Sequence, residues 1–151
     1  MHLQDVVNAF EDERNSMDSS HLDLSSNDAL GVVSVPLEKL GYRVEKPGSS
    51  IQVPVLYGEN GHPSKYYAVD ALNLSERTVI EVEAGTGVAN NGYLKDLFQA
   101  CLLPDVDYLV VAVRQVYGKS KNYNTVCTAF ETMYTSTRLV LPLKGILVIG
   151  Y

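Results

Sequence analysis

The first forty residues carry apolar side chains at helical spacing in two segments. Over residues 3–14, apolar residues recur every three or four positions with acidic residues on the other side, which predicts an amphipathic helix. After a polar loop, a second helical pattern runs from about residue 26 to residue 40. We expect Pro36 to kink or divide that helix and Gly41 to end it.

After the second helix, the pattern changes to alternation of apolar and polar residues, which is typical of β-strands. Turn residues separate the alternating segments at 46–48 and 58–63. The last two segments, 65–72 and 78–83, are joined by a short connection and therefore predict a hairpin. The strands expected in this part of the chain cover residues 42–45, 51–55, 65–72 and 78–83.

The second half of the chain alternates between helical and extended patterns, as α/β proteins do. A glycine-containing loop at 84–92 precedes a helix over 93–102, which Pro104 ends. Residues 108–113 form an almost unbroken apolar run, which predicts a strand covered on both faces. The remaining expected elements are a basic polar loop at 118–122, a helix over 125–138 and a strand over 145–151. The apolar face of the 93–102 helix is expected to consist of Tyr93, Leu94, Leu97, Phe98, Cys101 and Leu102.

Length and composition are those of one globular domain. The chain has 151 residues, of which 46% are hydrophobic and 20% charged, so it is long enough to bury a core and is neither fibrous nor intrinsically disordered. No segment approaches the roughly 18 uninterrupted apolar residues of a membrane helix, and the N-terminal sequence is acidic rather than signal-like. We therefore expect one cytoplasmic domain over residues 1–151, with Cys101 and Cys127 as buried free thiols.

Three carboxylates lie in the predicted hairpin. Asp70 belongs to its first strand, and Glu81 and Glu83 share one face of the second, because side chains alternate along a strand. The hairpin would bring all three together. Such a cluster is unfavourable unless a cation neutralises it, and carboxylate oxygens suit hard ions such as Mg²⁺. The alternative is that Glu81-Val82-Glu83 only presents the polar face of an edge strand to water.

The segment from Lys65 to Tyr117, about a third of the chain, resembles the core of the PD-(D/E)XK nuclease superfamily, the fold of type II restriction endonucleases. In that family's motif, an Asp on one strand is followed by (D/E)-x-K on the next strand, then by a helix and another core strand. Asp70 and Glu81 match the two metal-binding positions, whereas Glu83 occupies the lysine position, as in some restriction enzymes of the family. The resemblance implies an α/β fold in which a restriction endonuclease-like mixed central sheet is flanked by helices.

Chemically, the resemblance implies hydrolysis of DNA that depends on Mg²⁺, with Mn²⁺ as an alternative ion. Asp70, Glu81 and the backbone carbonyl of Val82 would hold the metal, which polarises the scissile phosphate and activates a water. Glu83 would help to orient or deprotonate that water, or would ligate a metal. A chain of this length leaves little room for a separate sequence-reading domain, so we expect a homodimer that pairs two cuts across a duplex.

Basic residues near this segment are candidates for contacts with the substrate. Lys95 lies one turn into the helix after the acidic strand, on its polar side with Asp96, and is a candidate to replace the missing lysine; an ordinary solvated lysine is the alternative. Arg114, Lys119 and Lys121 are candidates to contact the DNA backbone, or else form a solubilising loop. The net charge of −6 counts against strong non-specific binding of nucleic acid, although an acidic metal site contributes to it.

The remaining sequence features carry less chemistry. Gly85-Thr86-Gly87 lacks a dinucleotide fingerprint and is interpreted as a flexible loop, and Asn90 or Asn91 is expected to cap the following helix. The histidines have no ligand-like spacing, which counts against a zinc site. Two alternatives to a nuclease stay open: a catalytically inactive nuclease-fold module that binds nucleic acid or a protein, and a general α/β interaction domain whose acids are surface groups.

Overall fold

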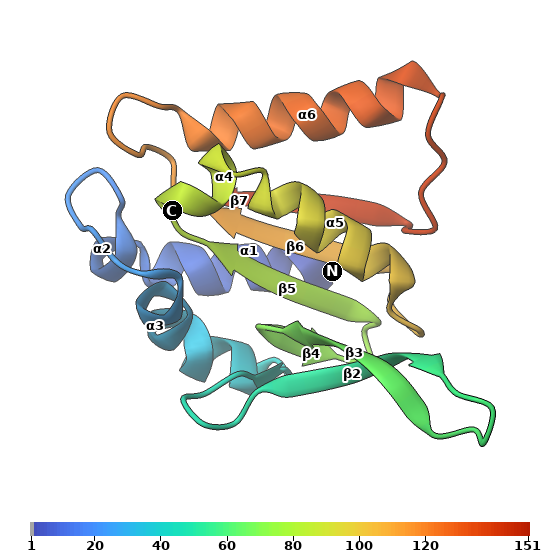
Figure 1. The fold of residues 1–151 in the computed structure, drawn as a ribbon. Helices are drawn as coiled ribbons and strands as arrows, with labels where there is room; N and C mark the ends of the chain where they lie inside the picture. The colour runs from blue at the N-terminus through green and yellow to red at the C-terminus, as the bar shows by residue number, and fades with distance from the viewer. Residues whose placement is uncertain (1) are drawn as a thin grey trace.

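A mixed β-sheet forms the centre of the protein, in a computed structural model that describes residues 2–151 (Figure 1). In sheet order its strands are β1 (Arg43–Val44), β4 (Ala71–Asn73), β5 (Thr78–Glu83), β6 (Tyr108–Val113) and β7 (Gly145–Gly150). The pairings β1–β4 and β4–β5 are antiparallel, whereas β5–β6 and β6–β7 are parallel. The parallel pairs need crossover connections, and helices provide them.

Helices cover both faces of this sheet, so the predicted α/β class with a mixed central sheet is confirmed. The helices are α1 (His2–Asp12), α2 (Arg14–Met17), α3 (Ser26–Lys39), α4 (Gly85–Ala89), α5 (Gly92–Leu102) and α6 (Asn122–Ser136). On one face, α1 and α3 pack on the sheet around Val33 and Ile80, in what we call the first core. On the other face, α5 and α6 pack around Leu97 and Val111, in the second core.

α3 keeps Pro36 inside one helix, so the helix is not divided there, which was one of the two expected effects of this proline. The helix starts with a capping box: the Ser25 hydroxyl accepts a hydrogen bond from the N–H of Asp28 at 3.1 Å, and the Asp28 carboxylate accepts one from the N–H of Ser25. Pro36 lies in the last turn of α3, so the helix loses only one backbone hydrogen bond near its end. Val33 and Leu37, before and after the proline, are buried in the first core and hold this part of the helix in place. Gly41 ends the helix at φ 87°, as predicted.

The extended segment predicted over 65–72 is two strands that meet at a bend at Asp70. The first of them belongs to a separate two-stranded antiparallel sheet, made of β2 (Ile51–Tyr57) and β3 (Pro63–Val69). After the bend, β4 joins the central sheet. Val69 anchors the β2–β3 hairpin in the second core, whereas the hairpin tip at 58–62 is exposed. Asp70 is thus the joint between two sheets.

The segment predicted as a loop over 84–92 contains a short helix, α4. The turn from α4 into α5 places Asn91 in the left-handed conformation, at φ 57°. Asn91 is therefore the N-terminal cap position of α5, although its side chain makes no capping hydrogen bond. The apolar face predicted for α5 is too wide: Leu97 is buried, but Phe98 is 63% and Leu102 46% exposed.

The amino ends of β5, β6 and β7 meet at a cluster of ion pairs. Asp107 Oδ2 lies 2.8 Å from Arg77 Nε and 2.7 Å from Lys144 Nζ. The hydrogen bonds from Arg77 and Lys144 lower the pKa of Asp107 to about 2. Because Glu83 ends β5, this cluster lies at the opposite edge of the sheet from the predicted metal site.

Both cysteines are free, and each is only partly buried, so the predicted free thiols are found nearer the surface than expected. The sequence also predicted no membrane helix. Over residues 2–151, no helix combines the length and the apolar character needed to cross a bilayer.

Candidate metal centre

Asp70 lies beside the second strand of the β4–β5 hairpin. Ala71 pairs with Ile80, so the preceding position places Asp70 opposite Glu81 in the antiparallel register. The Asp70 carboxylate accepts a hydrogen bond of 2.7 Å from the backbone N–H of Val82. This bond fixes the acid at the bend to the strand that carries the two glutamates.

Glu81 and Glu83 project from the sheet face that α5 covers. Val82, between them, belongs to the first core on the opposite face, and side chains alternate along a strand. Asp70 shares the face of the glutamates, since Leu72, two positions further along, belongs to the second core. Glu81 is 8% exposed and Glu83 is half-buried. The structure therefore brings the three predicted acids to the same face of the hairpin.

The Glu83 carboxylate fits against two glycines. A Cβ at Gly87 would lie 1.5 Å from Glu83 Oε2, and a Cβ at Gly92 would lie 2.9 Å from Oε1. Gly87 therefore provides space for the carboxylate, in place of the loop flexibility that the sequence suggested. The backbone carbonyl of Glu83 also accepts a hydrogen bond of 3.0 Å from the Tyr151 hydroxyl. Glu83 is held at both its backbone and its side chain.

A fourth carboxylate, Asp96 of α5, is buried beside Glu83. Asp96 is 3% exposed, and among the described residues its Oδ2 has no hydrogen-bond donor. Burial, and then the adjacent Glu83 carboxyl, raise the pKa of Asp96 to about 8. Lys95 Nζ lies 3.9 Å from Asp96 Oδ1, and the lysine side chain is 66% exposed. Asp96 thus faces the acids, not the polar side predicted for it, and Lys95 approaches them from solvent.

Burial and mutual repulsion also raise the pKa values of the hairpin acids. Burial, and then the charges of Glu45 and Glu83, raise the pKa of Asp70 to about 6, although the backbone hydrogen bond opposes the rise. Burial and the charge of Asp70 raise the pKa of Glu81 well above its usual value, and the positive charge of Lys95 partly opposes this shift. Without a cation, these carboxylates are held in a site that disfavours their ionised forms.

The donor set suits a hard divalent cation. Asp70, Glu81, Glu83 and Asp96 supply only carboxylate oxygens, which Mg²⁺ and Mn²⁺ prefer. The buried Asp96 oxygen that lacks a donor within residues 2–151 is a further observation in favour of a positive ligand. In the same residues, no group of three or more His, Cys, Asp or Glu side chains is already spaced to hold an ion. The residues fit a metal by the chemistry of their oxygen donors and not by their present spacing.

Of the three basic residues predicted to contact the DNA backbone, Arg114 is buried and the two lysines are exposed. Arg114 is 5% exposed, its Nη1 lies 2.6 Å from Asp23 Oδ1, and it also donates to the Leu24 carbonyl. Arg114 thus fastens the loop before α3 to the end of β6 and is not free to contact a DNA backbone, contrary to the sequence interpretation. Lys119 and Lys121 are exposed.

Two acids of the site were not found from the sequence. Glu45 follows β1, and its backbone N–H donates to the Asp70 carbonyl at 2.7 Å. Glu45 comes close to Asp70 only because β1 pairs with β4, and the local sequence pattern does not predict which strands pair. Asp96 did carry a signal: helical spacing places it on the same side of α5 as Tyr93 and Ala100, which are both buried.

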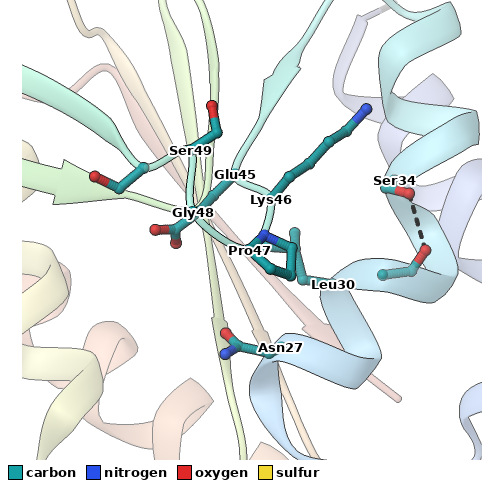
Figure 2. Close-up of a pocket in the computed structure, with 10 residues that line it drawn as sticks. Asn27, Leu30, Ser34, Glu45, Lys46, Pro47, Gly48 and Ser49 are labelled. Atoms are coloured by element: carbon teal, nitrogen blue, oxygen red, sulfur yellow. Dashed lines mark hydrogen bonds between the residues drawn. The ribbon is translucent and has the colours of Figure 1, made fainter.

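A groove opens next to Glu45, between α3 and the connection from β1 to β2 (Figure 2). Its volume is about 700 Å³. Figure 2 shows the Glu45 and Lys46 side chains pointing away from each other, with Pro47 close to Leu30 of α3. The lining residues are Asn27, Leu30, Gly31, Ser34 and residues 45–50. The groove therefore starts at a neighbour of Asp70.

Comparison of the chain with protein-family models, with curated proteins and with solved structures gives no match. The function is therefore inferred from the geometry and electrostatics of the residues themselves.

Proposed function

We propose that the protein is a divalent-metal-dependent endonuclease that hydrolyses phosphodiester bonds of DNA, with a restriction endonuclease-like fold. The observation that supports the proposal is that Asp70, Glu81 and Glu83 lie on one face of the β4–β5 hairpin, with Asp96 buried beside Glu83. Buried carboxylates that repel one another lower the stability of a fold. Such an arrangement is typical of a functional site whose ligand is positively charged.

Each residue has a role in this proposal. Asp70, Glu81 and the Val82 carbonyl would hold Mg²⁺ or Mn²⁺, which when bound supplies a Lewis acid for the scissile phosphate. The Glu83 carboxylate, held against Gly87, would accept a proton from the attacking water. The water oxygen would bond to phosphorus as the P–O3′ bond breaks, leaving 5′-phosphate and 3′-hydroxyl ends, as the family resemblance implies. The mostly exposed ammonium of Lys95, whose Nζ lies 3.9 Å from Asp96 Oδ1, would offset negative charge on the phosphate.

The proposal includes a homodimer acting on duplex DNA. The two strands of a duplex are related by a two-fold axis, so a two-fold pair of chains would present one acidic site to each strand.

Nicking of supercoiled plasmid in Mg²⁺ or Mn²⁺ tests the proposed activity. Wild-type protein should nick the plasmid, and EDTA should abolish nicking. Asp70→Asn keeps an oxygen that accepts from the Val82 N–H but removes a charged ligand, so we expect nicking to fall by about 100-fold or more. Asp12→Asn, an exposed acid at the end of α1, is the matched control and should nick at the wild-type rate. Nicking that persists in EDTA, or in Asp70→Asn, would contradict the proposal.

A second candidate is a nuclease-fold module that binds DNA without cutting it. Glu83 favours it, because it places a negative charge where the family motif has lysine. Purified protein that retards DNA in a gel but never nicks it in either ion would establish this function in place of the endonuclease.

A further inference from the structure

The groove beside Glu45 adjoins the bend at Asp70. Its inner end is fixed to the site, because the Glu45 N–H donates to the Asp70 carbonyl at 2.7 Å. We propose that this groove binds one unstacked nucleotide of the substrate strand, next to the phosphate that is cut. The inference rests on the proposed function, which places the scissile phosphate at the acids.

The groove lining has the chemistry of a nucleobase site. Pro47 presents an exposed apolar ring to the groove, whereas Leu30 is 3% exposed and only closes the bottom of the groove, and aromatic bases bind through their apolar faces. Asn27, Ser34 and Ser49 supply amide and hydroxyl groups for the polar edge of a base. The faces of a base inside a duplex are covered by its neighbours, so only an unpaired or displaced base could lie on the Pro47 ring. The volume of about 700 Å³ is in the range of pockets that enclose a small ligand.

Gly31 is the observation that favours a ligand over an accidental hollow. A glycine inside a helix lowers the stability of that helix relative to alanine. Packing does not require glycine here, since a Cβ at position 31 would meet no atom of the described chain within 4 Å. The backbone does not require it either, because Gly31 is not among the residues with positive φ. The absent side chain leaves the groove open on the α3 side.

The two charged residues give the groove a direction. Glu45 lies at the end that meets Asp70, and Lys46 points the other way (Figure 2). Lys46 Nζ lies 2.5 Å from Glu38 Oε1, and its side chain is 57% exposed. A surface ion pair of this kind is exchanged easily for another anion. A nucleotide whose cleaved phosphate is at the acids would therefore direct its other phosphate toward Lys46.

Two substitutions at Gly31 test the proposal without disturbing the core. Gly31→Trp fills the groove, whereas Gly31→Ala adds only a methyl group in open space and should raise the thermal midpoint. The probe is a fluorescein-labelled duplex with a short unpaired end, and its binding is measured by anisotropy in Ca²⁺. We expect about tenfold weaker binding for Gly31→Trp and no more than about a twofold change for Gly31→Ala. A blunt, fully paired duplex should bind both variants equally. Ser49→Trp adds the same bulk from the opposite wall and should reproduce the loss if Gly31→Trp folds poorly.

The outcomes separate this inference from the proposed activity. Equal binding of the unpaired-end probe by the tryptophan and alanine variants would overturn the groove inference, while plasmid nicking that depends on Asp70 would leave the endonuclease in place. Equal weakening for the unpaired-end and blunt probes would overturn the assignment to an unstacked nucleotide. Wild-type protein that neither binds nor cuts either DNA would overturn the proposed function and the groove inference together.

Discussion

The Asp70 carboxylate and the Val82 N–H form a hydrogen bond of 2.7 Å, so the acid at the bend is fastened to the strand between the two glutamates. The bond also fixes the register of the hairpin at this point. A shift of one residue would move Glu81 and Glu83 to the other face of the sheet. This hydrogen bond and the pairing of β4 with β5 together hold the three acids on one face.

Without metal, the protein should lose stability as pH rises. The pKa values of Asp70 and Asp96 are raised to about 6 and about 8 in the fold, so the folded state binds more protons than the unfolded chain at pH values above the usual range for Asp. The slope of unfolding free energy against pH is then negative from about pH 4 to about pH 8. Thermal unfolding in EDTA across this range measures it. Mg²⁺ should raise the midpoint more at about pH 8 than at about pH 5, and a metal effect that is independent of pH would contradict the assignment of these acids as its ligands.

Asp96→Asn should stabilise the metal-free protein at alkaline pH. The amide cannot ionise and can donate a hydrogen bond to the Glu83 carboxylate, which the buried aspartate can do only when protonated. We expect a gain on the order of 1 kcal/mol or more at about pH 8 and a smaller gain at about pH 5. Chemical denaturation at the two pH values measures the difference. Asp12→Asn, at an exposed position, should show no such pH dependence. A loss of stability at alkaline pH would mean that the Asp96 charge is already compensated.

Gly87→Ala should impair the site more than the fold. The added Cβ would occupy the position of Glu83 Oε2, so the carboxylate must turn away. We expect nicking to fall by about 100-fold, because misplacement by about 1 Å is enough for such a loss, and stability to fall by about 1–3 kcal/mol. Gly58→Ala is the matched control, since its Cβ would be 3.8 Å from the nearest backbone oxygen. Equal nicking by the two alanine variants would show that the position of Glu83 is irrelevant to catalysis.

Asp107→Asn should have the opposite effect, lowering stability while leaving the site intact. The pKa of Asp107 is depressed to about 2 by Arg77 and Lys144, so its contribution is present above about pH 4 and is lost as pH falls through about 2. The thermal midpoint at neutral pH should therefore drop in the variant, and the difference should shrink in high salt, because the basic partners Arg77 and Lys144 are exposed to solvent. Nicking measured well below the midpoint should equal that of wild type. Lost nicking in this variant would show that effects of site mutations can arise from stability alone.

Local patterns were enough to predict the elements that carry the glutamates and the helix behind them. The β-branched run at 78–83 and the apolar run at 108–113 were placed correctly, since strands with such composition have few other ways to bury their side chains. Pro104 marked the end of α5 for the same local reason. Each of these predictions depends only on residues close in sequence.

The errors arose where partners are distant in sequence. Nothing within 65–72 shows that its two halves pair with different strands, so the bend at Asp70 was missed. Arg114 is basic and lies near a polar loop, and only the return of the chain at Asp23 buries it. Asp96 was placed on the polar side because an aspartate inside a helix is usually solvated. In this protein Asp96 is instead buried beside the other carboxyl groups, although their negative charges repel one another.

The bend at Asp70 also separates the exposed β2–β3 hairpin from the central sheet that carries the glutamates. β2 and β3 pair only with each other, and their tip at 58–62 is in solvent. The hairpin can therefore be lengthened or shortened by pairs of residues, which preserves the alternation of its faces, and its charged residues can be replaced. Evolution, or a protein engineer, could vary what this arm touches without altering a single bond to the acids.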